Sequence, residues 1–345
     1  MDVGYTRHTL LAPATVKWED RMKAICIREI GDKRILQYEE VPDPTFGPRD
    51  VLVRVRAASV NGGDLGLRDG MSIATSLSEP LIIGWDVAGD VADVGSEVEK
   101  TVVGQRVVLA RLPRGEGGYA ELIAVPETFV VPIPDNMDYD QAASLPVAFL
   151  TAWSALLANA KLKEGETALI QAAGSGVGMA AIQIAKQIAK AQVFTTAGSD
   201  EKVSKATELG ADVAINYSTQ NFLSEVQRLT DGHGVQVALD VVGGEVFSRT
   251  QQSLASYGRL VSVGRSSGIP AEPDHVLAKL KHHEVITRMQ QNVEEDPENL
   301  AMIVKLVSEG TLTPVIDRVF PLSEAVEAHH HLRNRAQFGK VILRP

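Results

Sequence analysis

A glycine-rich turn between a strand-like run and a helical pattern is the feature that most constrains the fold of this chain. The run from Thr167 to Gln171 is typical of a strand covered on both faces. The turn Ala173 to Gly178 follows, and apolar residues then recur at helical spacing up to Lys190. A second strand is expected over Gln192 to Thr196, and strands and helices alternate onward to Val263. This alternation predicts an α/β region with a parallel, doubly wound sheet.

The turn itself predicts a site for a dinucleotide. Glycines there let a pyrophosphate approach the backbone, and the helix that follows offers free N–H groups and its positive dipole end. The register that fits is Ala-x-x-Gly-x-Gly, because Met179 replaces the last glycine of the commoner pattern. A turn whose glycines only close a tight bend is the alternative. The residues expected to contact the cofactor are Ala173, Gly174, Ser175, Gly176, Val177 and Gly178.

The end of the second expected strand indicates which dinucleotide binds. NAD sites usually place an acidic residue there to bind the ribose 2′-hydroxyl, whereas NADP sites avoid it and add a cation. No acid ends this strand, and Ser199 and Lys202 follow as candidates to hold a 2′-phosphate. Asp200 and Glu201 lie in the same turn and are the alternative, since Ser199 is also suited to cap a helix. We expect NADPH in preference to NADH.

The regions on either side of this unit have a different pattern. Residues 22–146 contain short alternating segments divided by Gly and Pro, which predicts a small, mostly antiparallel, barrel-like domain. After residue 287 a helix and two strand-like segments follow. We expect residues 22–146 and 288–345 to form one discontinuous catalytic domain, residues 147–287 to be the inserted cofactor domain, and residues 1–21 to be an N-terminal extension.

Composition excludes several classes of partner. The net charge is -10 and no basic block is present, so nucleic acid and anionic membrane surfaces are not expected as partners. No apolar stretch approaches the roughly 18 residues that a membrane span needs, and the first residues do not resemble a signal peptide. The single cysteine, Cys26, cannot form an intramolecular disulfide and is expected to be an inert core thiol. We expect a cytoplasmic protein.

Several segments together resemble a known family. The chain is similar, from about Met22 to its end, to the zinc-free quinone oxidoreductase branch of the medium-chain dehydrogenase/reductase superfamily, which includes zeta-crystallin. The resemblance implies a Rossmann cofactor domain and a GroES-like catalytic domain. The segments that carry it are Asn61 to Asp64 with Arg68 and Gly70, Gly84 to Gly89, Gly117 to Glu121, Leu145 to Ala152, the glycine turn, and Phe338 to Lys340.

The resemblance also argues against zinc. Asn61, Trp85 and Val147 match the positions of the catalytic zinc ligands in zinc-dependent relatives, and these side chains cannot form a tetrahedral zinc site. One cysteine cannot supply a four-cysteine site either. The run His329 to His331 is typical of a metal-binding tract, but neighbouring positions on a helix point apart, so we expect a solvated helix face.

Without a Lewis acid, the hydroxyl of an alcohol is not easily ionised, so alcohol oxidation is a poor candidate reaction. Reduction of a quinone or another conjugated carbonyl compound needs less help and is the better candidate. Asn61 is the candidate donor to the acceptor oxygen, with Asp64 and Arg68 pairing along a helix to steady the cleft wall. Thr151 is expected to bind the nicotinamide amide or, alternatively, to cap a helix. The resemblance implies four more cofactor contacts, at Val263, Gly264, Phe338 and Lys340.

Two alternative functions stay open at this stage, and two further features are expected. The same scaffold suits reduction of α,β-unsaturated aldehydes, ketones or thioesters. The chain could also bind NADPH as a structural or regulatory protein without useful turnover. The segment after Asn61 carries no aromatic ring, which indicates a wider acceptor pocket than in some relatives. The family implies a homodimer, for which the strand Arg259 to Val263 is the candidate pairing edge.

Overall fold

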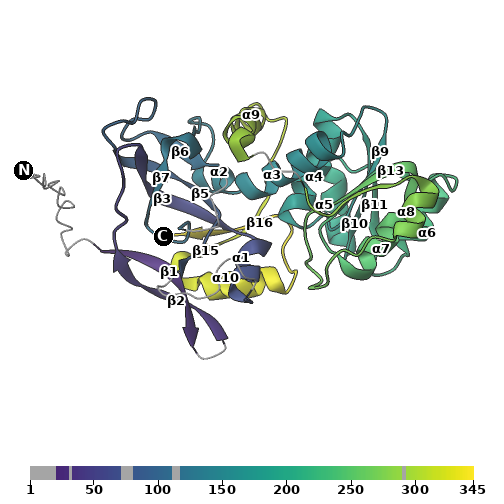
Figure 1. Cartoon of the computed structure of the whole chain (residues 1–345), viewed down its shortest axis with the longest axis horizontal. Coiled ribbons are helices and arrows are strands. Elements are labelled where there is room, and N and C mark those ends of the chain that lie inside the picture. Colours follow the sequence, from purple (N-terminus) through teal and green to yellow (C-terminus); the bar gives the residue numbers. More distant parts are fainter. Residues whose placement is uncertain (1–20, 31–32, 71–80, 111–116, 290–292) are drawn as a thin grey trace, which may run out of the picture.

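The structure, a computed structural model, describes residues 21–30, 33–70, 81–110, 117–289 and 293–345. Two lobes lie side by side along the long axis of the molecule (Figure 1). One lobe is built on a parallel sheet and the other on a mostly antiparallel sheet. The expected fold class, a Rossmann-type sheet combined with a GroES-like antiparallel sheet, is confirmed.

The parallel sheet has six strands in the order β11-β10-β9-β12-β13-β14, and every neighbouring pair is parallel. The strand order reverses at β9, so the turn after β9 lies at the switch point where ligands bind in such sheets. The strands are β9 (Thr167–Ile170), β10 (Gln192–Ala197), β11 (Val213–Asn216), β12 (Val235–Asp240), β13 (Leu254–Ser262) and β14 (Glu284–Ile286).

Helices cover both faces of this sheet, as the alternating pattern predicts. The predicted end of the helix α5 is accurate. Gly210 follows this helix with a φ of +109°, which suits glycine at the C′ position. The helices are α4 (Gly176–Gln183), α5 (Asp200–Glu208), α6 (Phe222–Leu229), α7 (Gly244–Gln252) and α8 (His275–Lys281).

The other lobe contains a sheet of order β15-β16-β3-β5-β6-β8, in which β7 also pairs with β3, and a small sheet of order β2-β1-β4. Strands β15 and β16 come from the end of the chain, and antiparallel pairing places Val341 of β16 opposite Val60 of β3. The strands are β1 (Arg21–Ile30), β2 (Lys33–Pro42), β3 (Asp50–Val60), β4 (Leu81–Ile82), β5 (Asp86–Val94), β6 (Arg106–Leu109), β7 (Leu122–Pro126), β8 (Val130–Pro132), β15 (Ile316–Pro321) and β16 (Lys340–Arg344).

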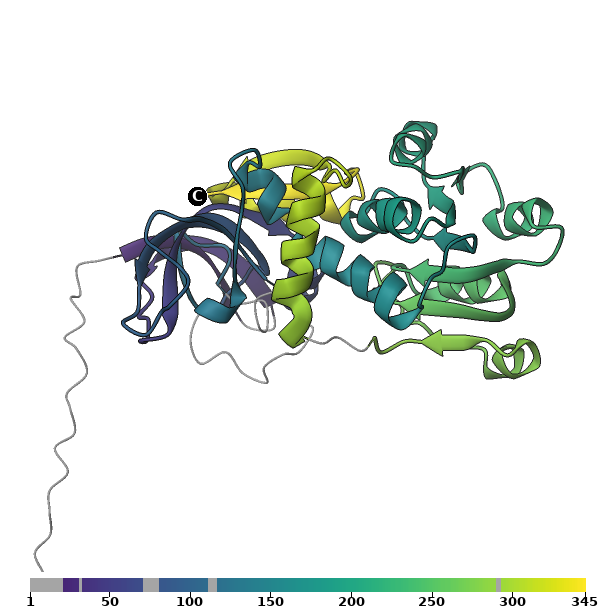
Figure 2. The same ribbon diagram turned by 90° about the horizontal axis from the view of Figure 1, so that it is seen from above.

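Among the residues described, five α-helices accompany this lobe, and α9 stands between the two lobes in Figure 2 and packs against α3. Helix α10 contacts α1, so the chain's last helix lies beside the one that follows β3. These helices are α1 (Gly62–Arg68), α2 (Tyr139–Ala143), α3 (Pro146–Trp153), α9 (Asp296–Ser308) and α10 (Ala325–Arg333).

Two details differ from the expectations. Arg21 is the first residue of β1, and residues 1–20 of the expected extension lie outside the described residues. The expected dimer edge, Arg259 to Val263, is not an edge, because β14 pairs with β13 through Leu260 and Val285. The sequence pattern does not predict this strand, which follows α8. The division of the chain at residues 146 and 288 stays a prediction, although strands from both ends of the chain share one sheet.

Among the helices that the structure describes, none has the length and the apolar character needed to cross a membrane.

Candidate cofactor and acceptor site

The glycine turn, residues 172–178, is held by local hydrogen bonds. Ser175 caps α4, because its Oγ accepts a hydrogen bond of 2.9 Å from the Gly178 N–H and donates one of 2.9 Å to the Ala172 carbonyl. Ala172 has a φ of +59°, which gives the chain its sharp bend between β9 and α4. The free N–H groups at the start of α4 therefore face the switch point of the sheet.

Close packing explains two of the glycines. A Cβ atom at Gly178 would lie 2.2 Å from the Ala172 carbonyl oxygen, so no side chain fits between α4 and the turn. A Cβ at Gly176 would lie 2.7 Å from Cδ of Lys340. Ala173 and Gly178 are buried, whereas residues 174–177 are half-buried and form the surface that a pyrophosphate can reach.

The chain's C-terminal segment closes over this turn. The Gly339 N–H donates to the Gly174 carbonyl at 3.0 Å, and the Phe338 ring lies beside Gly174. Asp317 of β15 fixes the segment, since its Oδ1 accepts from the Phe338 N–H at 3.0 Å and its Oδ2 pairs with His331 at 2.7 Å. The structure thus brings the predicted residues Phe338 and Lys340 to the predicted glycine turn.

The acidic residues after β10 already have partners. Asp200 accepts a hydrogen bond of 2.7 Å from the Asn216 amide, and Glu201 pairs with Lys205 at 2.7 Å. Ser199 caps α5 by accepting from the Lys202 N–H at 3.3 Å. The helix-cap interpretation of Ser199 is therefore correct for this structure, and each of the two acids has a side-chain partner.

A cationic corner lies beside these residues. Lys202 Nζ donates to the Arg335 carbonyl at 2.7 Å, and burial lowers the pKa of Lys202. Arg335 in turn donates to the Ser266 carbonyl at 2.9 Å. The Tyr217 hydroxyl lies against Gly198, where a Cβ would be 2.6 Å away. Tyr217 and Arg335 were not expected from the sequence, since each lies far along the chain from Lys202.

The other predicted cofactor residues lie around the same end of the sheet. Val263 and Gly264 follow β13 and are half-buried, and a Cβ at Gly264 would lie 2.9 Å from the Val241 carbonyl oxygen. Thr151 is buried within α3, one turn after Ala148, whose Cβ would lie 3.5 Å from a Cβ at Gly176. Because Thr151 lies inside the helix, the alternative that it caps a helix is wrong.

A buried cluster formed by Asn61, Asp86 and Lys340 lies next to the turn, and we call it the Asn61 cluster. Lys340 Nζ donates to Asn61 Oδ1 at 2.6 Å and to Asp86 Oδ2 at 3.2 Å, with side-chain exposures of 3% for Lys340 and 0% for Asp86. Asp86 also accepts from the Ser59 hydroxyl at 2.6 Å and from the Val147 N–H at 2.9 Å. The buried ammonium group is thus paired by a carboxylate and an amide oxygen.

The two amide hydrogens of Asn61 are also engaged. Its Nδ2 donates to Asp86 Oδ2 at 2.9 Å and to the Ser59 carbonyl at 3.2 Å. An acceptor carbonyl would have to replace the longer of these bonds to receive a hydrogen bond from Asn61. In this structure the side chain orients Lys340 and Asp86, and its direct contact with a substrate stays a prediction.

Asp64 and Arg68 do not form the expected pair. The segment is helical, but Asp64 is fully buried, and its Oδ2 accepts from the Asn61 N–H at 2.7 Å and from the Tyr119 hydroxyl at 3.0 Å. Arg68 is half-buried on the same short helix, and no ion pair joins it to Asp64 in the part of the chain described. The prediction failed because Asp64 points inward, toward the N-terminus of α1 and Tyr119.

The positions that the resemblance matches to zinc ligands carry an amide, an indole and an alkyl side chain, at Asn61, Trp85 and Val147. Asn61 Nδ2 and the Val147 N–H both donate to Asp86, and Asn61 Oδ1 accepts a hydrogen bond from the Lys340 ammonium. The indole N–H of Trp85 is a donor and cannot coordinate a metal ion. Within the described ranges, no three His, Cys, Asp or Glu side chains are grouped closely enough to hold a metal ion.

The histidine run on α10 is only partly solvated. His329 is fully buried, and its Nε2 lies 3.4 Å from the Tyr119 hydroxyl, whereas His330 is exposed and His331 pairs with Asp317. The three rings therefore point in different directions, as predicted, but the expectation of a solvated face is wrong for His329. No sequence signal indicated that His329 reaches Tyr119.

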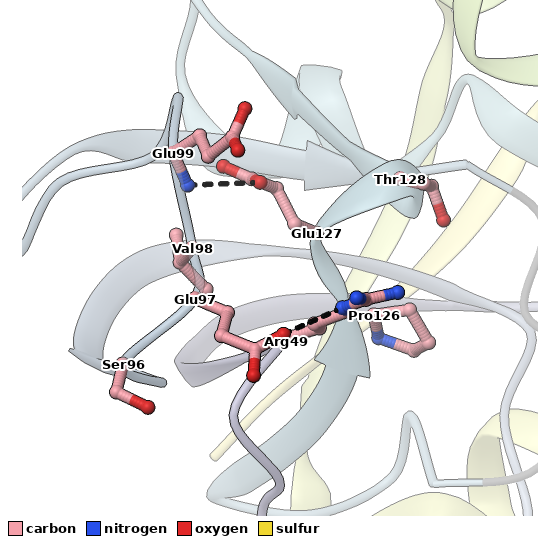
Figure 3. Close-up of a pocket in the computed structure, with 8 residues that line it drawn as sticks. All are labelled: Arg49, Ser96, Glu97, Val98, Glu99, Pro126, Glu127 and Thr128. Atoms are coloured by element: carbon pink, nitrogen blue, oxygen red, sulfur yellow. Dashed lines mark hydrogen bonds and ion pairs between the residues drawn. The ribbon is translucent and has the colours of Figure 1, made fainter.

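A hollow of about 550 Å³ lies on the antiparallel lobe, where Arg49, Glu97 and Glu127 have partners among the residues around it (Figure 3). Arg49 pairs with Glu97 at 2.8 Å, and the Glu127 carboxylate accepts hydrogen bonds from three consecutive main-chain N–H groups, of which the Lys100 bond measures 2.6 Å. It is separate from the glycine turn and we assign no ligand to it.

Comparison with known proteins places this geometry in a family. Residues 47–135 match the family described as "Alcohol dehydrogenase GroES-like domain", and residues 209–343 match "Zinc-binding dehydrogenase". A quinone oxidoreductase of Pseudomonas aeruginosa is 35% identical over 328 residues, which is 94% of this chain and 99% of that protein.

Two solved structures share the fold over almost the whole chain. An NAD-dependent alcohol dehydrogenase is 35% identical with a TM-score of 0.86, covering 94% of this chain and all of that one. The quinone oxidoreductase of Escherichia coli, solved with NADPH, is 27% identical with a TM-score of 0.85, again covering 94% of this chain and all of that one.

The two lobes, the glycine turn and these matches define an oxidoreductase of the medium-chain dehydrogenase/reductase class. Within that superfamily the chain belongs to the quinone oxidoreductase branch, the one that includes zeta-crystallin.

Proposed function

We propose that this protein transfers hydride from NADPH to a quinone or a similar conjugated carbonyl compound, without a metal ion. The observation that carries the proposal is the buried Lys340 ammonium between Asn61 and Asp86. A metal cation at this position would be repelled by the ammonium group. Asn61, Trp85 and Val147 do not supply a set of zinc ligands. The description of one matched family as zinc-binding does not fit these residues.

The preference for NADPH rests on the corner after β10. Strand β10 ends at Ala197 without the acid that an NAD site usually carries there, and Asp200 and Glu201 pair with Asn216 and Lys205. Lys202 Nζ donates to the Arg335 carbonyl, the Arg335 side chain donates to the Ser266 carbonyl, and the Tyr217 hydroxyl lies against Gly198; these three residues would hold a 2′-phosphate. Lys202 would exchange its bond to the neutral Arg335 carbonyl for a charge-assisted bond. The E. coli relative was solved with NADPH, which supports the same cofactor.

NADPH, when bound, supplies the hydride, and the residues of this chain bind and orient the cofactor and the acceptor. Residues 174–177 and the start of α4 would hold the pyrophosphate, with Lys340 directly behind Gly176. Thr151, buried within α3, would hold the nicotinamide amide, and Val263 and Gly264, which follow β13, would line the site. Hydride attack on a conjugated carbonyl gives a delocalised anion that water can protonate. Positioning in a water-poor site therefore supplies most of the catalysis.

The direct test is oxidation of NADPH with a panel of quinones, enones, enals and enoyl thioesters. We expect the highest turnover with quinones. Turnover confined to enones, enals or thioesters would identify the second candidate activity. Tight NADPH binding with no turnover on any acceptor would contradict an enzymatic role and indicate a structural or regulatory protein.

We also propose that the protein is a cytoplasmic homodimer. Four apolar side chains are strongly exposed around α8 and β13, next to the sheet edge at β14, and burial of such a surface favours self-association. These are Tyr257 at 72%, Ile269 at 58%, Val276 at 70% and Leu280 at 73% exposed. Light scattering at micromolar concentration should give twice the chain mass, and a monomer mass would reject the dimer.

Burial raises the pKa of the Cys26 thiol to about 12, as suits an inert thiol.

A further inference from the structure

A row of three buried titratable side chains lies behind the Asn61 cluster, and we call it the Asp64 row. It consists of Asp64, Tyr119 and His329, each 0% exposed. The Tyr119 hydroxyl lies 3.0 Å from Asp64 Oδ2 and 3.4 Å from His329 Nε2. The three residues come from α1, the segment before β7, and α10, so only the folded chain brings them together.

Each end of the row carries an unpartnered polar atom. Asp64 Oδ1 and His329 Nδ1 are buried, and neither has a hydrogen-bond partner in the described structure. An ionised carboxylate with a buried, unpaired oxygen is more costly than a neutral acid in the same place. The Tyr119 hydroxyl can donate to Asp64 when that carboxyl is ionised, or to His329 when Asp64 carries a proton and donates instead.

The surroundings decide which member of the row titrates. Burial raises the pKa of Asp64 to about 7, while hydrogen bonds from the Asn61 N–H and Tyr119 oppose the rise. Burial, assisted by Arg68, lowers the pKa of His329 to about 3, so this ring stays neutral. The charged groups that face the row are Asp86 and Lys340 at Asp64, and Arg68, Asp69, His330 and Arg333 at His329.

The row is joined to the cofactor side by direct contacts. Asp64 accepts the Asn61 N–H at 2.7 Å, and Asn61 holds the Lys340 ammonium, whose side chain lies against Gly176. When Asp64 is neutral, the charge of Lys340 is balanced by Asp86 alone. When Asp64 is ionised, a second negative charge lies behind the turn where an anionic pyrophosphate is proposed to bind.

We propose that Tyr119 is a positioning residue that acts on the dinucleotide site through Asp64. Its hydroxyl, shared with His329, shifts the pH at which Asp64 adds a negative charge to the Asn61 cluster. Ionisation of Asp64 therefore weakens binding of the dinucleotide as the pH rises. This inference rests on the proposed function, because it concerns the site where NADPH is proposed to bind.

The first experiment measures the NADPH Kd by fluorescence titration from about pH 5 to about pH 9 in four proteins. The wild type should bind more weakly as the pH rises through about 7. Tyr119→Phe removes a donor to the carboxylate, so the midpoint should move up by about one pH unit. Asp64→Asn should abolish this transition. Ionisation of NADPH itself is common to all four proteins and cancels in the comparison.

The matched control is Tyr139→Phe. The Tyr139 hydroxyl also bonds a carboxylate, that of Asp90, in the same lobe, but has no contact with the Asp64 row in the described structure. This variant should keep the wild-type midpoint. A Tyr119→Phe midpoint equal to that of the wild type would overturn the proposal.

The second experiment needs neither cofactor nor turnover. Because folding raises the pKa of Asp64, its contribution to stability is present below pH 3.8 and is lost as the pH rises to about 7. Urea unfolding of the cofactor-free Asp64→Asn protein should show a flatter pH dependence over this range than the wild type. An unchanged pH dependence would overturn the proposal even if Tyr119→Phe does not fold. Absence of NADPH binding in the wild type would instead overturn the proposed function, while the unfolding series still decides the role of the row.

Discussion

The glycine turn and the Asn61 cluster touch each other, yet the chain builds them in opposite ways. In the turn, the bond between Ser175 and Gly178 joins residues three positions apart. In the cluster, Asn61 meets Asp86 across 25 positions and Lys340 across 279. The turn is therefore a local structure, whereas the cluster exists only when β16 has paired with β3 at the end of the chain. The comparison teaches that the glycine turn is fixed by local sequence and the Asn61 cluster by topology.

The largest effect is expected when the cluster loses its cation. Lys340→Met leaves the Asp86 carboxylate buried and unpaired, and removing one partner of a buried pair costs roughly 3–5 kcal/mol. Urea unfolding measures this loss. Lys186→Met, which breaks the partly exposed pair with Asp212, is the matched control and should cost about 0–1 kcal/mol. Equal losses in both variants would show that the cluster is no more demanding than a surface pair.

The next effect concerns the cofactor end. Lys202→Ala should weaken NADPH binding by roughly 1.5–3 kcal/mol and leave NADH binding almost unchanged, because only NADPH carries the 2′-phosphate. Isothermal titration with both cofactors measures the difference. Lys205→Ala, on the same helix but paired with Glu201, serves as the control. Equal weakening of both cofactors by Lys202→Ala would remove Lys202 from the phosphate site.

Asn61→Ala is expected to have a smaller effect, and it distinguishes the two roles of that residue. Asn61 orients Lys340 and Asp86, so the variant should lose thermal stability and also slow hydride transfer roughly tenfold, while NADPH affinity changes little. Melting temperature and single-turnover NADPH oxidation on the same preparation separate these effects. A destabilised variant with wild-type hydride transfer would leave Asn61 with a purely structural role.

The same contrast explains which parts of the molecule could be predicted from the sequence. Hydrophobic periodicity and the glycine turn predicted the parallel sheet, its helices and the end of α5, because these depend on neighbouring residues. The resemblance added Lys340 and Phe338 as cofactor contacts, and the structure brings both to the turn.

The errors concern contacts between distant segments. Spacing alone suggested that Asp64 pairs with Arg68, but spacing does not show that Tyr119 donates to Asp64 from across the lobe. The histidine run likewise gave no sign that His329 is buried against Tyr119. Asp86 lies within a segment that carried the family resemblance, yet its bond to Lys340 depends on a strand pairing that periodicity cannot predict.

The most direct test of the central claim is to measure NADPH-dependent quinone reduction and zinc content on one sample, before and after treatment with a strong chelator. Because the Lys340 ammonium occupies the position between Asn61 and Asp86, we predict the same turnover in both states and no stoichiometric zinc by elemental analysis. About one zinc per chain, lost together with turnover on chelation, would contradict the account.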